Sequence, residues 1–167
     1  MYNSPVLFDQ SDTIVEKFTM QPERRKYLII SDQKKTDVVK HFMNDIEQQV
    51  QYESYEINGE ADLEKVNEVL ILQKMGTQLY IAADWDNAVD IFTAAVEAGF
   101  TEEDIQTVIY GPKRRYVYCM KCYRLNEINK EKEAQCSHCD AMMEVGPFFS
   151  KVRKGYIGYP FIPVKSF

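Results

Sequence analysis

The hydrophobic pattern between residues 26 and 110 changes repeatedly between two periods. Short apolar runs of strand length lie at 27–30, 79–83 and 105–110, and a weaker alternating segment lies at 51–57. Between them, apolar residues recur at spacings of three and four, which is typical of an amphipathic helix. These helical stripes comprise Val38, Val39, Phe42, Met43 and Ile46; Leu63, Val66, Val69, Leu70 and Leu72; and Ala88, Val89, Phe92, Ala95 and Val96. We expect the second helix to end at Gly76 and the third to span 85–98.

Strands that alternate with helices favour a parallel sheet with crossover connections. The order β-α-β-α-β-α-β therefore predicts an α/β fold, a small Rossmann-like sandwich at 26–111. Residues 1–25 are mixed in polarity, with apolar positions at Val6, Leu7, Phe8, Ile14, Val15 and Phe18. We expect this N-terminal arm to pack on the fold or on a partner.

Charge divides the chain of 167 residues into two parts. Residues 1–110 carry 9 basic and 21 acidic side chains, and residues 111–167 carry 11 basic and 5 acidic ones, so the net charges are -12 and +6. The sign changes at the turn dipeptide Gly111-Pro112, which we take as the boundary between two domains. The total of -6 argues against a nucleic-acid binder, which usually has a basic balance.

No apolar stretch approaches the roughly 18 residues that a membrane span needs. The first ten residues also lack the basic and apolar regions of a signal peptide. We expect a cytoplasmic protein that does not enter a membrane.

All four cysteines lie in the C-terminal part, as two C-x-x-C pairs separated by thirteen residues. Paired C-x-x-C spacing in a reducing compartment is typical of a four-thiolate metal site. The pattern predicts a zinc ribbon at 112–150 with one structural zinc ion, whose ligands are Cys119, Cys122, Cys136 and Cys139. Rubredoxin-type iron uses the same ligand set, so iron stays an alternative. A [2Fe-2S] cluster is a more distant one.

Other candidate chemistry is sparse. His138 lies inside the second pair, where four thiols already complete the ligand set, and His41 is isolated, so we assign neither histidine a role. The turn at 31–37 lacks the glycines of a dinucleotide-binding turn. The sequence also has no G-x-x-x-x-G-K-[ST] loop, G-x-S-x-G elbow or H-E-x-x-H helix. We predict no catalytic residues and no cofactor-binding residues.

Basic residues flank the cysteines: Lys113, Arg114 and Arg115 precede them, and Lys151, Arg153 and Lys154 follow. On a zinc ribbon such residues point to nucleic acid. Attachment to an acidic protein partner, or to the acidic N-terminal part of the chain itself, explains the same residues, and the acidic balance of that part favours this interpretation over nucleic acid.

The segment 151–167 and the residues just before it combine aromatic side chains with Gly and Pro. This composition suggests an irregular aromatic tail that either anchors a partner or packs on the chain's own core. The candidate partner contacts are Phe148, Phe149, Tyr156, Tyr159 and Phe161.

Residues 76–111 resemble the last strand-helix-strand of the NAD(P) module of ferredoxin reductases. In that module the strand ends in a Cys-Gly-Pro turn, whereas Ala82-Ala83-Asp84 stands here, and the flavin-binding barrel is missing. The resemblance implies a degenerate reductase module that does not contact nicotinamide.

Residues 118–159 resemble the C-terminal region of the small subunit of bacterial dimethylamine monooxygenase. The resemblance rests on the two C-x-x-C pairs, the Phe149-Ser150-Lys151 stretch and the Gly-aromatic ending at 155–158. It implies a subunit of a haem-dependent oxidative N-demethylase that uses NADPH and O2. The haem, FMN and [2Fe-2S] groups would then belong to two partners, a haem-containing catalytic subunit and a flavin and iron-sulfur reductase subunit.

Three functions follow from these observations. The first is a noncatalytic zinc-binding subunit that docks the redox and catalytic partners of the monooxygenase. The second is a rubredoxin-like electron carrier with iron in the cysteine site. The third is a zinc-ribbon nucleic-acid-binding protein.

Overall fold

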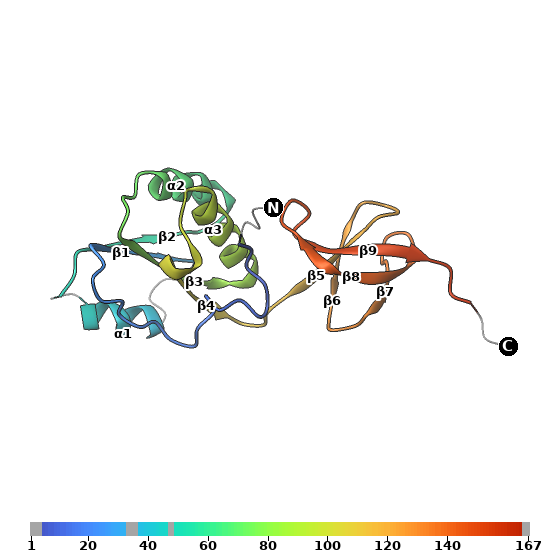
Figure 1. The fold of residues 1–167 in the computed structure, drawn as a ribbon, viewed down its shortest axis with the longest axis horizontal. Helices are drawn as coiled ribbons and strands as arrows, with labels where there is room; N and C mark the ends of the chain where they lie inside the picture. Colours follow the sequence, from blue (N-terminus) through green and yellow to red (C-terminus); the bar gives the residue numbers. More distant parts are fainter. Residues whose placement is uncertain (1–4, 33–36, 47–48, 165–167) are drawn as a thin grey trace. The chain divides into compact units, whose positions relative to one another are not determined.

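The computed structural model describes residues 5–32, 37–46 and 49–164. It divides into two compact units, an N-terminal unit (Met1–Lys113) and a C-terminal unit (Arg114–Phe167). Each unit contains its own sheet, so the two are described separately (Figure 1).

The N-terminal unit is an α/β layer structure around a four-stranded sheet. Its elements are β1 (Lys26–Ser31), α1 (Asp37–Ile46), β2 (Tyr52–Glu56), α2 (Glu60–Ile71), β3 (Thr77–Asp84), α3 (Trp85–Glu97), the 3-10 turn η1 (Glu102–Asp104) and β4 (Ile105–Tyr110). The strands lie in the order β2-β1-β3-β4, and every pair is parallel. The predicted alternation of strands and helices around a parallel sheet is confirmed. The second helix ends at Ile71, earlier than predicted, and Gly76 lies in the turn that leads into β3.

Side chains alternate across each strand, so the sheet has two buried faces. Leu28, Ile30, Leu79 and Ile81 pack against α2 and α3, whereas Tyr27, Ile29 and Tyr80 pack against α1. Figure 1 shows α2 and α3 on one side of this sheet and α1 on the other. Both faces are covered, which explains why the strands are nearly continuous apolar runs.

Residues 5–25 pack on this unit. Leu7 and Phe18 are buried, one in each of the two cores. Ile14 forms a parallel bridge with Thr107, and the backbone N–H of Val15 donates to the carbonyl of Thr107 at 2.8 Å. This segment therefore lies along the outer edge of β4.

The C-terminal unit is a five-stranded sheet. Its strands are β5 (Arg115–Cys119), β6 (Leu125–Ile128), β7 (Glu133–Gln135), β8 (Met142–Ser150) and β9 (Gly155–Phe161), in the order β6-β5-β9-β8-β7. The β5–β9 pair is parallel and the other pairs are antiparallel. The expectation of an irregular tail after residue 150 is wrong for 155–161, because β9 is the central strand of this sheet.

Glycine explains how β9 fits between its neighbours. A Cβ atom on Gly155 would lie 3.0 Å from the carbonyl oxygen of Tyr116, and one on Gly158 would lie 2.8 Å from side-chain atoms of Val117 and Met143. Glycine within a strand often marks such a close approach of another chain segment. The Gly and Pro content that suggested an irregular tail thus reflects tight packing in a sheet.

Candidate metal centre

Two turns with the same backbone geometry carry the four cysteines. In the first, the N–H of Tyr123 donates to the carbonyl of Cys119 at 2.8 Å, and Tyr123 has a φ of 61°. In the second, the N–H of Asp140 donates to the carbonyl of Cys136 at 3.0 Å, and Asp140 has a φ of 57°. A left-handed conformation costs an ordinary residue about 1–2 kcal/mol. Its presence right after both pairs shows that each turn is held in a specific shape.

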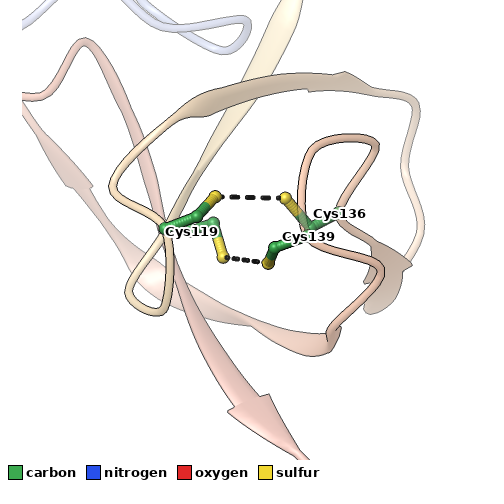
Figure 2. Close-up of side chains that lie close together, drawn as sticks. Cys119, Cys136 and Cys139 are labelled. Atoms are coloured by element: carbon green, nitrogen blue, oxygen red, sulfur yellow. Dashed lines mark hydrogen bonds between the residues drawn. The ribbon is translucent and has the colours of Figure 1, made fainter.

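The turns bring the four sulfurs together (Figure 2). The Sγ atoms of Cys119 and Cys139 are 3.8 Å apart, and those of Cys122 and Cys136 are 3.5 Å apart. All four lie within 4.8 Å of one another, and none forms a disulfide. A tetrahedral zinc site with Zn–S bonds of about 2.3 Å needs sulfurs about 3.8 Å apart. The four predicted residues therefore form one cluster that can hold a single metal ion, and the donor set fits zinc.

Hydrogen bonds lower the pKa of one of these thiols, that of Cys136. Burial opposes ionisation of Cys136, but hydrogen bonds from the backbone N–H groups of His138 and Cys139 outweigh it and lower the pKa of Cys136 to about 6. Burial raises the pKa of Cys122 to about 12, and its hydrogen bond with Cys136 acts in the same direction. The two shifts have opposite directions and favour the thiolate form at Cys136 over that at Cys122. A metal ion held by all four sulfurs must displace the protons of the thiols that still carry them.

Asn126 on β6 supports the second turn. It is buried, its Oδ1 accepts from the backbone N–H of Ser137 at 2.8 Å and from the Ser137 hydroxyl at 2.9 Å, and its Nδ2 donates to the Sγ of Cys136 at 3.5 Å. Groups that hydrogen-bond to metal ligands fix their orientation and tune their affinity. The sequence analysis missed Asn126. An asparagine in a short strand between the two pairs gives no local signal of this contact.

The comparisons with known proteins bear on this unit. Residues 116–159 match the family model described as dimethylamine monooxygenase subunit DmmA-like, C-terminal domain. Most of the C-terminal unit is therefore similar to this domain. This match covers the four cysteines and most of the strands β5 to β9. No curated protein and no solved structure matches the chain.

Neither histidine belongs to the sulfur cluster. The exposed His138 has its Nδ1 3.4 Å from the Nη1 of Arg124. His41 lies on α1 in the N-terminal unit, with its Nδ1 2.6 Å from the carbonyl oxygen of Asp37. The four cysteines alone make up the sulfur cluster.

The five aromatic residues that we predicted as partner contacts occupy different environments. Phe149 and Tyr156 pack edge to face, with ring centroids 5.6 Å apart. Phe148 is 75% exposed and Tyr159 is 53% exposed, whereas Phe161 is half-buried. The role of all five as partner contacts stays a prediction.

The basic residues near the metal centre stack on tyrosine rings. The guanidinium groups of Arg114, Arg115 and Arg153 lie 5.1, 4.4 and 4.8 Å from the ring centroids of Tyr116, Tyr156 and Tyr118 respectively. Arg114 also forms a bidentate ion pair with Glu127, with N–O distances of 2.9 and 3.0 Å. These guanidinium groups are therefore held in place before any partner binds.

The glycine-poor turn after β1 falls partly outside the described residues, because 33–36 are not described. At its start, the Asp32 Oδ2 accepts from the backbone N–H of Asp84 at 2.8 Å and from the Asn87 side chain at 3.0 Å. These bonds join the carboxyl ends of β1 and β3, where open α/β sheets usually bind ligands. A carboxylate at this edge repels the pyrophosphate of a dinucleotide.

Proposed function

We propose that this chain is a noncatalytic, zinc-binding subunit of a multisubunit haem-dependent dimethylamine monooxygenase, in which it docks the redox and catalytic subunits. The observation that carries the proposal is the four-thiolate cluster within a unit that matches the DmmA-like C-terminal domain. The partners would be a haem-containing catalytic subunit and a flavin and iron-sulfur reductase subunit. The complex would transfer electrons from NADPH to haem, activate O2 and release a methylamine carbon as formaldehyde.

Zinc in this site would be structural. Four thiolates fill a tetrahedral coordination shell, whereas a catalytic zinc keeps one position open for water or substrate. The ion would join the turn at Cys119–Cys122 to the turn at Cys136–Cys139. Four reduced cysteines also suit the reducing cytoplasm, where we propose that the complex resides.

Haem, FMN and the [2Fe-2S] cluster would belong to the partner subunits. The sequence contains four cysteines, and all of them contribute to the cluster described above, so an additional iron-sulfur cluster has no thiolate ligands here. This division of cofactors makes the chain an assembly subunit of an enzyme, without an active site of its own.

Iron in the same site defines the second candidate function, a rubredoxin-like electron carrier. The ligand set supports this reading as well, because ferric iron also binds four thiolates tetrahedrally. Purified protein from the native host distinguishes the two. A colourless protein with about one zinc per chain supports the proposal, whereas a coloured protein with about one iron supports the electron carrier.

Reconstitution tests the assembly role. We expect the haem and reductase subunits, coexpressed with this chain, to form a complex that produces formaldehyde from dimethylamine and NADPH. Without this chain we expect the complex to fall apart on size-exclusion chromatography. A complex that assembles and turns over normally in its absence would contradict the proposed function.

A further inference from the structure

One face of the C-terminal sheet packs on the metal centre, and the opposite face is covered by no other layer within this unit. Val117, Met143 and Val145 point to the cysteine core. The described residues of this unit form one sheet and no helix, so no second layer of the unit packs on the other side. Such a sheet face is a candidate interaction surface.

The strand register identifies the side chains on that other face, because directly paired residues point to the same side and side chains alternate along a strand. Tyr118 pairs with Leu125 on β6 and with Ile157 on β9. Phe161 on β9 pairs with Met142 on β8. We call this face the outer face; it comprises Tyr118, Leu125, Met142, Ile157, Tyr159 and Phe161.

Glycines on the outer face leave room for large neighbouring side chains. The site where Gly146 would carry a Cβ lies 2.8 Å from the ring of Tyr159, and the corresponding site on Gly155 lies 2.9 Å from the side chain of Leu125. The side chains of Tyr159 and Leu125 therefore pack directly over the backbone of these two glycines. The ring of Tyr159 is nevertheless 53% exposed. An exposed aromatic ring on an uncovered sheet face suits a protein interface.

The charge on this face is uneven. Between Val145 and Phe167 the sequence contains four basic residues and no carboxylate, and three of the four lie in the turn Lys151–Lys154. Arg153 from that turn reaches back over the ring of Tyr118, and no ion pair of Arg153 occurs among the described residues. The exposed Glu144 lies on the same face beside Tyr159, at the end away from the turn. Positive charge is thus concentrated at the turn end.

We infer that the outer face binds an apolar surface of a partner subunit, with a carboxylate of that subunit paired to Arg153. The inference rests on the proposed function, which supplies the partner. An apolar protein surface with a single carboxylate fits better than nucleic acid, because Glu144 and Glu127 on this face would repel the repeated phosphates of a nucleic-acid backbone. The rings of Tyr116 and Tyr118 are also already stacked by arginines, so they are not open to bases.

The test measures binding of the zinc-loaded chain to the haem subunit and to the reductase subunit, each immobilised separately. We expect the wild-type chain to bind one of them. Arg153→Glu and Tyr159→Ser should each weaken that binding about thirtyfold or more, because buried arginine and tyrosine anchors dominate interface energies. The Arg153→Glu effect should diminish at high salt, since it includes a lost ion pair.

Two control variants distinguish a specific effect of the outer face from the general effect of a charge change or of a lost apolar side chain. Lys130→Glu makes the same charge change at another exposed position of the unit, and Leu72→Ser removes a side chain that is 77% exposed on the N-terminal unit. Both should change affinity by no more than about twofold. Every variant is checked for one zinc per chain, which shows that the unit is folded.

The outcomes distinguish the two proposals. Outer-face variants that bind as tightly as the wild type overturn the inference and leave the proposed function intact. A wild-type chain that binds neither subunit overturns the proposed function, and the inference falls with it. If Tyr159→Ser instead converts a dimer of this chain into a monomer, or abolishes binding to a single-stranded oligonucleotide, the occupant is a second copy or a nucleic acid and the inference is wrong.

Discussion

Loss of the metal should unfold the C-terminal unit and leave the N-terminal unit folded. The cysteine cluster of the C-terminal unit contains four fully buried residues, of which Cys119 and Cys136 belong to the candidate metal centre. The other buried apolar side chains described in this unit are Val117 and Met143 in the same cluster and Tyr118 on the opposite sheet face. Burial of one such side chain contributes about 1.5–3 kcal/mol. Structural zinc contributes about 10–16 kcal/mol in small zinc domains. Zinc bound at this centre would therefore stabilise the unit more than its apolar core does, and we expect that the core cannot compensate for loss of the ion.

The variant that tests this reasoning is Cys136→Ser, with His138→Gln as the control in the same turn. We expect Cys136→Ser to bind no zinc and trypsin to cut it rapidly after the lysines and arginines of residues 114–154. We expect His138→Gln to keep zinc and to resist trypsin like the wild type, because His138 is not part of the sulfur cluster.

A separate probe reports on the N-terminal unit in the same samples. Trp85 is the single tryptophan of the chain, and it is buried at the start of α3. Its fluorescence melting temperature should be the same in the wild type and in Cys136→Ser. A Cys136→Ser chain that lacks metal yet keeps residues 114–164 resistant to trypsin would refute the reasoning, as would a fall in the Trp85 transition of more than a few degrees.

Three further predictions address the support of the site, the stability of the fold and nucleotide binding. Asn126→Ala should weaken zinc affinity about 10–100-fold in competition with a chelator, since it removes a hydrogen bond to Cys136; an unchanged affinity would mean that Asn126 only packs. Burial raises the pKa of Asp104, but hydrogen bonds from Thr101 and Arg24 outweigh burial and hold this pKa below its usual range. The ionised Asp104 carboxylate therefore stabilises the fold fully above about pH 4, the pKa of an unfolded aspartate, and this stabilisation is lost as the pH falls through the lower pKa of the folded state. Asp104→Asn should therefore lower the free energy of unfolding at pH 7 by about 1 kcal/mol, measured by urea unfolding followed by Trp85 fluorescence. An equal loss at pH 2 would show that the charge of Asp104 is not the cause. Titration with flavin should show no binding and titration with NADPH only weak binding; a micromolar dissociation constant, about -8 kcal/mol, would reveal a working nucleotide site.

Local periodicity determined the N-terminal fold. The apolar runs at 27–30 and 105–110 each predict a strand that is buried on both faces. In the segments between the strands, apolar residues at spacings of three and four predict helices. These signals depend on neighbours within about ten residues, so they can be read from the sequence without knowledge of the partner elements. The C-x-x-C spacing is equally local, because the backbone of each turn alone brings its two sulfurs together.

The tertiary structure decided which segments that are far apart in the sequence come into contact. The placement of β9 between β5 and β8, and the hydrogen bond from Asn126 to Cys136, join residues whose separation has no periodic signature. Gly155 and Gly158 made the sequence of β9 look unlike a strand, because glycine is uncommon within strands. Both glycines leave room for atoms of the neighbouring strands, and a local sequence pattern does not show this contact. The sequence alone therefore predicted which four cysteines come together in one cluster. Long-range pairing decided which strands surround it and which sheet face stays uncovered, because strand pairing depends on packing across the whole unit and not on the residues of one strand.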